Sequence, residues 1–193
     1  MLMDAVPFIA RWSGEDDTSP LVMRRDGRGI GYADERSFDR VDGFLWMRAP
    51  SQPGRGKPEY GKVHSLRQRL AMLGQRCQIC GGAADRSAEG VLWLVDARPD
   101  ELRFGEERTT HPPVCAPCAR RSVHACPHLR KAWVALRVRS YLMWGVNGAL
   151  YRPSQPRPVA VDAGTYPFDH PNMPWILASQ LIAELRDFTV TEL

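Results

Sequence analysis

Four cysteines in the middle of the 193-residue chain form two Cys-x-x-Cys pairs. The first pair is Cys77 and Cys80, and the second is Cys115 and Cys118. Two thiolates three positions apart in a tight turn can both reach one tetrahedral ion, and a second pair completes a closed four-sulfur site. The Gly81–Gly82 dipeptide gives the first turn the backbone freedom that it requires. The spacing therefore predicts a structural Zn²⁺ ion held by these four ligands.

Other uses of these cysteines stay open at this point. Five cysteines, an odd number, and the lack of a secretory pattern in Met1–Asp4 disfavour a disulfide framework. A thioredoxin-like redox site would need only one pair, and unrelated buried thiols are a further alternative. Cys126, His111 and His128 could each replace a ligand or bind a second ion, because imidazole is as good a zinc ligand as thiolate. One closed zinc site is the most economical interpretation.

The residues around the two pairs resemble the treble-clef zinc domain of HNH endonucleases. The resemblance covers about residues 63–128: a helix, the Arg76–Gly81 knuckle, the β-rich run Val91–Asp96, a variable loop, and Pro113–Arg120 entering a second helix. It implies a treble-clef scaffold around one zinc ion. In that family a Val-Asp-His triplet supplies the histidine that activates water, and another histidine follows the last cysteine.

Both of those histidines are replaced here. The triplet reads Val95-Asp96-Ala97, and Ala119 follows the last cysteine. A hydrolytic nuclease needs a base near its water and a metal to stabilise the phosphate, and alanine supplies neither. Asp96 could hold a cation or be a turn residue, and His111 or His124 could take over the lost roles. We therefore predict no catalytic residues, with an HNH-type endonuclease of relocated catalytic residues as an alternative.

Positive charge is concentrated around and after the second pair. Residues 108–161 contain nine basic side chains and no Asp or Glu, whereas the whole chain has a formal net charge of only +4. Such a segment should project a positive field towards a polyanionic partner. The alternative is a solvated face on an Arg-rich protein, since Arg outnumbers Lys 23 to 3. The candidate nucleic-acid-binding residues are Arg120, Arg121, Arg130, Lys131, Arg137 and Arg139.

These features predict a non-catalytic regulatory or accessory protein that binds DNA or a DNA-bound protein. The competing class is a protein–protein interaction module, for which the acidic C-terminal segment and the proline-rich loops could provide a surface. The Arg, Ala, Gly and Pro bias of a GC-rich genome, the degenerate HNH-like centre and the lack of enzyme motifs resemble small accessory proteins of actinobacteria, their phages and plasmids. A recombination directionality factor for a serine integrase is one example of that class. No small-molecule site is evident.

The elements that must position these residues follow from turn signals and periodicity. In the N-terminal region, Leu21–Arg25 and Gly29–Tyr32 flank an Asp-Gly turn signal and predict a hairpin. Further on, the spacing of Val63, Leu66, Leu70 and Leu73 predicts a helix over 63–73 with these side chains on one face, and Gly74 is its C-cap.

The C-terminal third predicts a hairpin followed by a helix. Apolar residues alternate with arginines at the start of residues 136–151. Apolar runs then flank Asn147–Gly148, which is a turn signal. Asn172 is a candidate N-cap for a helix from Trp175 to Leu185, and Phe188–Thr191 reads as a final strand. The expected fold class is therefore α+β, a treble-clef zinc centre with flanking antiparallel strands and a C-terminal helix.

Length and composition set the limits of the domain organisation. A chain of 193 residues with 44% hydrophobic and 25% charged residues fits one folded domain, or one domain with an appendage. We expect three segments packed as one unit: a β-rich region 1–60, the zinc region 61–130, and the hairpin and helix of 131–193. No run approaches the roughly 18 apolar residues that a membrane span needs, so we expect a cytoplasmic protein without a membrane partner.

Overall fold

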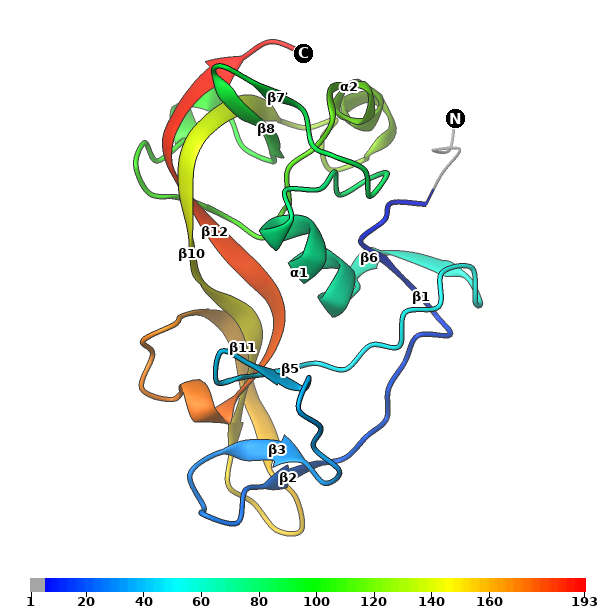
Figure 1. The fold of residues 1–193 in the computed structure, drawn as a ribbon, viewed down its shortest axis with the longest axis vertical. Coiled ribbons are helices and arrows are strands. Elements are labelled where there is room, and N and C mark those ends of the chain that lie inside the picture. Colours follow the sequence, from blue (N-terminus) through cyan, green and yellow to red (C-terminus); the bar gives the residue numbers. More distant parts are fainter. Residues whose placement is uncertain (1–5) are drawn as a thin grey trace.

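The computed structural model describes residues 6–193, and these form a mixed α+β fold that is mostly β-sheet (Figure 1). Eight strands make one sheet that curls into a half-barrel. These strands are β4 (Arg40–Val41), β5 (Phe44–Trp46), β7 (Arg86–Ser87), β8 (Gly90–Val95), β9 (Glu107–Thr109), β10 (Val134–Arg152), β11 (Val159–Pro167) and β12 (Ile176–Thr191). The main path through the sheet is β4-β5-β12-β10-β8-β7, while β11 pairs with β10 and β9 pairs with β12. The sheet thus contains strands from all three segments of the chain.

The two longest strands, β10 and β12, form the antiparallel spine of the sheet. Their pairing shifts register at four places, and such bulges bend and twist a strand. The predicted hairpin turn at Asn147–Gly148 is therefore wrong, because β10 continues through it. Gly148 is needed for a different reason: a Cβ there would lie 2.5 Å from the carbonyl oxygen of Leu177 on β12. The glycine allows a close approach between strands rather than a chain reversal.

The predicted C-terminal helix is also wrong. Asn172 precedes a single 3-10 turn, η2 (Met173–Trp175), and the chain then enters β12. Residues 181–185 are all buried, so β12 carries apolar side chains on both faces. A run of this kind satisfies helical spacing as well as strand spacing, because nearly every position is apolar. The predicted strand Phe188–Thr191 is confirmed as the end of β12.

Helix α1 (Ser65–Leu73) lies beside β12 in the middle of the molecule (Figure 1). The predicted helix and its Gly74 C-cap are confirmed. The helix face that carries the leucines is not the buried one, since Leu70 is 48% exposed and Leu73 is 58% exposed. The helix instead buries polar side chains, notably Arg67 and Gln68, together with Ala71 and Met72.

The N-terminal region contains two small sheets that pack on the rest of the chain. One is β1 (Ala10–Trp12) with β6 (Pro58–Val63), and the other is β2 (Leu21–Met23) with β3 (Ile30–Tyr32). The antiparallel β2–β3 pair confirms the predicted hairpin. Buried Glu15 forms an ion pair with Arg67 of α1, and the N–H of Phe8 donates to the carbonyl of Ile79. The region is thereby fastened to α1 and to the first Cys-x-x-Cys turn.

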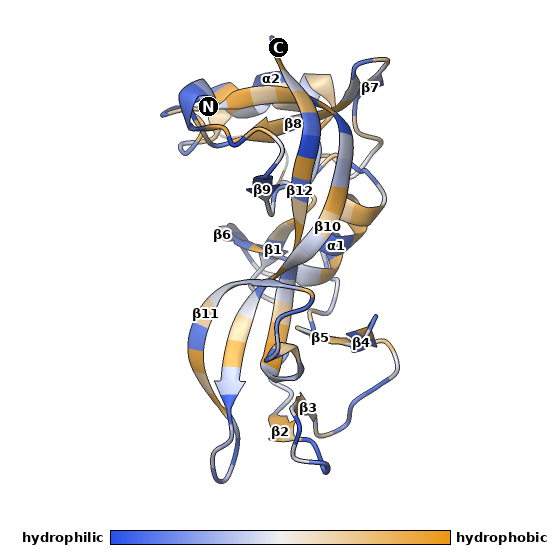
Figure 2. Ribbon diagram, turned by 90° about the vertical axis from the view of Figure 1, so that its left-hand side faces the viewer, coloured by the Kyte–Doolittle hydropathy of each residue, from blue (hydrophilic) through white to orange (hydrophobic). Residues whose placement is uncertain are grey.

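The hydrophobic core follows the long strands, and Figure 2 shows hydrophobic positions recurring along β10, β12 and β8. A second cluster lies between β8, β10 and helix α2 (Ala116–Ala125), and it surrounds the cysteines. Within residues 6–193, neither helix is long and apolar enough to cross a membrane. The chain start Met1–Asp4, from which we expected no secretory signal, lies outside the described residues.

Candidate metal centre

The first Cys-x-x-Cys pair lies in a tight turn directly after α1. The N–H of Cys77 donates to the carbonyl of Gly82 at 2.7 Å, and the N–H of Gly81 donates to the carbonyl of Cys77 at 2.8 Å. Gly81 has a φ of +74°, and a Cβ at this position would lie 2.8 Å from a ring carbon of Phe8. Glycine is thus required both for the backbone conformation and for packing against the N-terminal segment.

The second pair is positioned by the start of α2. Cys115 is the N-cap residue, Pro117 occupies the first turn, and Cys118 lies on the buried side of the helix. Ala119 is fully buried next to Cys118, in the cluster that contains Leu92 of β8. The two turns are also joined directly, since the N–H of Gln78 in the first turn donates to the carbonyl of Pro113 at 3.0 Å.

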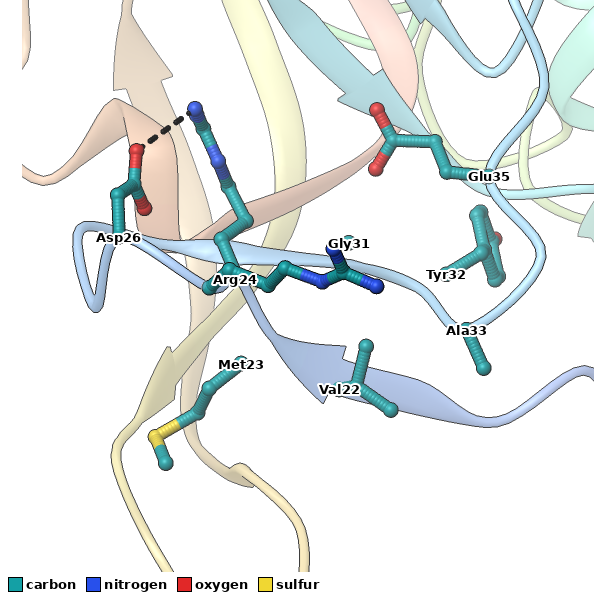
Figure 3. A pocket seen from close by; sticks show the side chains of 9 residues that line it. Val22, Met23, Arg24, Asp26, Gly31, Tyr32, Ala33 and Glu35 are labelled. Atoms are coloured by element: carbon teal, nitrogen blue, oxygen red, sulfur yellow. Dashed lines mark hydrogen bonds and ion pairs between the residues drawn. The ribbon is translucent and has the colours of Figure 1, made fainter.

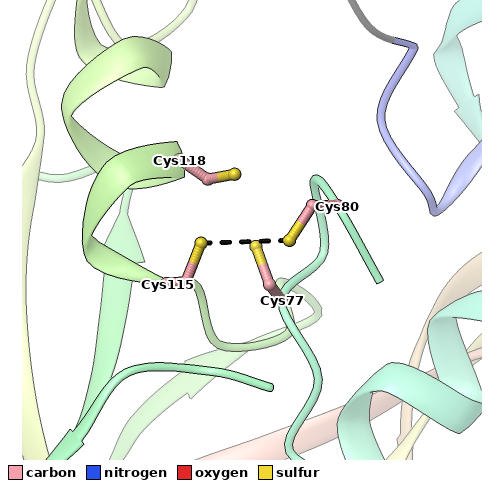
Figure 4. A group of neighbouring side chains, drawn as sticks. All are labelled: Cys77, Cys80, Cys115 and Cys118. Carbon is pink, nitrogen blue, oxygen red and sulfur yellow. Dashed lines mark hydrogen bonds between the residues drawn. The ribbon is translucent and has the colours of Figure 1, made fainter. Parts of the chain in front are cut away.

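The four sulfurs converge on one point (Figure 4). All of them lie within 4.8 Å of one another, and the Cys80 and Cys115 sulfurs are 3.9 Å apart. Four thiolates at about 2.3 Å from one tetrahedral Zn²⁺ ion would be separated by about 3.8 Å. Cys77 and Cys118 are buried, Cys115 is half-buried and Cys80 is exposed. The cluster is consistent with a structural metal such as zinc, as the spacing predicted.

Burial of the thiols gives a bound cation a clear role. Burial raises the pKa of Cys77, and it raises the pKa of Cys115 and Cys118 as well. At Cys80, burial is outweighed by a hydrogen bond from the Gly82 N–H and by the neighbouring thiols, so the pKa is lowered. Metal binding requires all four thiolates. A divalent cation among the sulfurs would stabilise the charges that burial disfavours and would hold the two turns together.

The alternative ligands lie outside this cluster. In the described part of the chain, a group of three or more Cys, His, Asp or Glu residues with converging ligand atoms occurs only at the four cysteines. Cys126 is the C-cap of α2, at the opposite end of the helix from Cys115, and its N–H donates to the carbonyl of Ser122. The backbone carbonyl of His111 accepts a hydrogen bond from Trp93 Nε1. Neither residue, nor His128, joins the four sulfurs.

The two positions at which the resemblance to HNH endonucleases would place histidines, 97 and 119, are occupied by packing residues. Ala97 follows β8 and packs against the main core cluster, while Ala119 is 0% exposed between α2 and β8. Asp96 is exposed at the end of β8. A larger side chain at Ala119 would have to displace its buried neighbours, which explains why a small residue is suited to this position.

The six predicted nucleic-acid-binding residues fall into distinct environments. On β10, Arg137 forms an ion pair with Asp85, and Arg139 forms a 3.5 Å ion pair with Asp187. Arg121 donates to the sulfur of Cys118. The three others, Arg120, Arg130 and Lys131, are exposed on α2 and on the turn that follows it.

A depression of about 390 Å³ lies over the β2–β3 hairpin (Figure 3). Its lining includes Met23, Tyr32, Glu35 and the ion pair of Arg24 with Asp26 at 2.9 Å. It contains no cysteine or histidine and carries both signs of charge, so we assign it no role.

Sequence reasoning missed three polar contacts that build the site and its support. Glu15 and Arg67 contact each other although they are 52 positions apart in the sequence. Gln68 and Leu181 are 113 positions apart, so no local pattern indicates either contact. The contact of Arg121 with Cys118 was open to prediction, because residues three apart on a helix share a face.

Compared with known proteins, the chain matches no family model, and no curated protein or solved structure is significantly similar to it.

Proposed function

We propose that this protein is a non-catalytic regulatory protein that binds DNA through α2 and the turn that follows it in the chain. Zinc would stabilise the scaffold that presents this surface. The proposal for the scaffold is a treble clef of the HNH kind. It is supported by the order of elements: a cysteine turn, the β7–β8 hairpin, and a helix whose first turn carries the second pair. Alanine at 97 and 119 supports a scaffold without hydrolytic activity.

The observation that carries the proposal is a set of unpaired cations. Within residues 6–193, Arg120, Arg130 and Lys131 have no acidic side chain within ion-pair distance, in contrast to Arg137 and Arg139. A cation that has no acidic partner is free to neutralise a phosphate and release its counterion. We therefore assign phosphate binding to the three unpaired side chains, and a structural role to the two paired ones.

The helix brings His124 into line with Arg120 of this set. Arg120 and His124 are four positions apart, so they lie on the same face of α2 about one turn from each other. The Nε of Arg130 donates to the carbonyl of His124 at 3.2 Å, which places a third basic group at the end of this row. Trp133, two residues after Lys131, is 37% exposed and could stack on an unpaired base.

A second candidate, docking on a DNA-bound protein, is favoured by the unexpected orientation of α1. Leu70 and Leu73 present apolar side chains to solvent from consecutive turns. Exposed apolar residues grouped on one helix face are a feature of protein interaction sites. In this form of the proposal, the protein would act as an accessory factor of a recombinase or a transcription complex, such as a directionality factor for a serine integrase.

The test is titration of the zinc-loaded protein into labelled duplex and single-stranded DNA at several salt concentrations. A parallel gel with Mg²⁺ or Mn²⁺ follows cleavage. We expect binding that weakens steeply as salt rises, with the DNA left intact. Cleavage would contradict the non-catalytic assignment and favour relocated catalytic residues. Absence of binding up to tens of micromolar would contradict DNA binding and leave the protein-docking candidate.

A further inference from the structure

Arg121 contacts one of the four sulfurs of the candidate metal centre. Its Nη2 donates a hydrogen bond to the Cys118 sulfur at 3.2 Å. The two residues are three apart in α2, so they share a helix face. Arg120 is the adjacent residue of α2, exposed and without an acidic partner in the described part of the chain. Two neighbouring arginines of the same basic segment therefore occupy different environments.

Among the described residues, Arg121 is the only side chain other than a cysteine that donates a hydrogen bond to one of the four sulfurs. The other hydrogen bond at these sulfurs joins Cys80 and Cys115, and it follows from the folding of the two turns. The bond to Cys118 comes from a side chain. It can therefore be removed by substitution without altering the backbone of either turn.

We propose that Arg121 is a positioning residue of the metal centre, which holds the Cys118 thiolate for the ion and offsets part of its charge. Four thiolates carry more charge than one Zn²⁺ ion neutralises, so the loaded centre is anionic. A charged N–H donor strengthens its hydrogen bond to an anion and fixes the orientation of the ligand. Arginine suits this role because it stays protonated and presents several donors. The inference rests on the four-sulfur centre and is independent of DNA binding.

The experiment compares the full-length wild type with Arg121→Met, Arg121→Lys and Arg121→Gln, and uses Arg120→Met as the matched control. Zn²⁺ affinity is measured by competition with a chromophoric chelator, in the absence of DNA. Arg121→Met should lower the affinity by about 10- to 100-fold, the usual effect of removing a partner of a metal ligand. Arg121→Lys, which keeps a charged donor, should recover most of this loss, and Arg120→Met should retain wild-type affinity.

Cobalt-loaded protein gives a readout that general loss of stability would not move. Removing a donor from a thiolate makes the sulfur a better electron donor to the metal. The sulfur-to-cobalt charge-transfer band of Arg121→Met should therefore shift to longer wavelength, while that of Arg120→Met stays in place. Arg121→Gln keeps a neutral donor and should lie between these two.

The inference is overturned if Arg121→Met binds zinc with wild-type affinity and shows an unshifted cobalt spectrum. It is also overturned if Arg120→Met produces the same losses, because the effect would then be one of net charge. Should Arg121→Met fail to fold, the Lys and Gln variants decide: spectra identical to wild type in both, with unchanged affinity, would contradict the role. Failure to bind DNA affects none of these outcomes.

Discussion

The side chain of Gln68 pairs with the backbone of Leu181 as a neighbouring strand would. Gln68 Oε1 accepts the Leu181 N–H at 2.9 Å, and Nε2 donates to the carbonyl of Leu181 at 2.9 Å and to that of Thr110 at 2.7 Å. On this edge of β12, β5 pairs with Leu177–Ala178 and β9 pairs with Ala183–Leu185. Gln68 fills the interval between these two strands, so α1 completes the edge of the sheet that supports the metal centre.

Replacing Gln68 should therefore be costly although the residue is polar. Gln68→Leu leaves buried backbone groups of β12 without partners, and each such group costs roughly 1 to 3 kcal/mol. We expect the free energy of unfolding to fall by about 2 to 4 kcal/mol. Denaturant unfolding of the purified variant, monitored by circular dichroism, measures this change.

The matched control is the reverse substitution on the same helix. Leu70 is 48% exposed, so Leu70→Gln should change the free energy of unfolding by no more than about 0.5 kcal/mol. If Leu70→Gln were the more destabilising of the two variants, the orientation of α1 described above would be wrong.

Glu15 should make stability depend on pH in the acid range. Burial disfavours its charge, but hydrogen bonds from Arg67 and from the backbone N–H groups of Trp12 and Gln52 outweigh burial and lower its pKa from 4.5 to about 2. A lowered pKa stabilises the folded state above the unfolded value, and this contribution is lost as the pH falls towards the folded value. Stability should therefore decrease between pH 5 and pH 3.

Comparison with Glu15→Gln measures this contribution together with the effect of Glu15 on His64. Burial lowers the pKa of His64, which lies 3.9 Å from Glu15, and the charge of Glu15 opposes this shift, whereas the metal ligands are the same in both proteins. The stability advantage of the wild type over Glu15→Gln should shrink by about 2 kcal/mol from pH 5 to pH 3. An advantage that stays constant over this range would show that Glu15 has an ordinary pKa.

The unpaired and paired arginines should differ in their effect on DNA binding. The triple variant Arg120→Ala, Arg130→Ala and Lys131→Ala removes three proposed phosphate contacts. Each contact contributes about 0.9 to the slope of log affinity against log salt, so the slope should become shallower by about 2 to 3.

The matched control replaces Arg137 and Arg139, whose charges already face Asp85 and Asp187. This double alanine variant should keep the wild-type slope in the same titration. A triple variant with the wild-type slope, or a double variant with the greater loss, would contradict the assignment of the binding surface.

Local signals in the sequence predicted the site better than the fold around it. Two residue pairs with fixed spacing were enough to predict which four cysteines come together, because the geometry of a knuckle is set within a few residues. The β2–β3 hairpin and the C-terminal end of α1 at Gly74 followed from a turn signal and a cap residue in the same way.

The errors arose where distant contacts decide the structure. The run from Ile176 to Leu185 is buried on both sides of a sheet, and apolar spacing alone does not distinguish such a strand from a helix. The side of α1 that faces the core is chosen by Glu15 and Leu181, both far away in sequence, rather than by its leucines. Likewise, Gly148 looks like a turn residue until the backbone of β12 is placed beside it.

The most direct test of the account is the metal content of the chain, measured by native mass spectrometry and by thermal melting. We predict one zinc ion per wild-type chain. Cys118→Ser should lose the metal and lower the melting temperature, because a structural zinc site contributes directly to folding free energy. Cys126→Ser should keep one zinc ion and the wild-type melting temperature, since Cys126 lies outside the cluster. Full zinc content and unchanged melting in Cys118→Ser would contradict the four-cysteine centre on which the account rests.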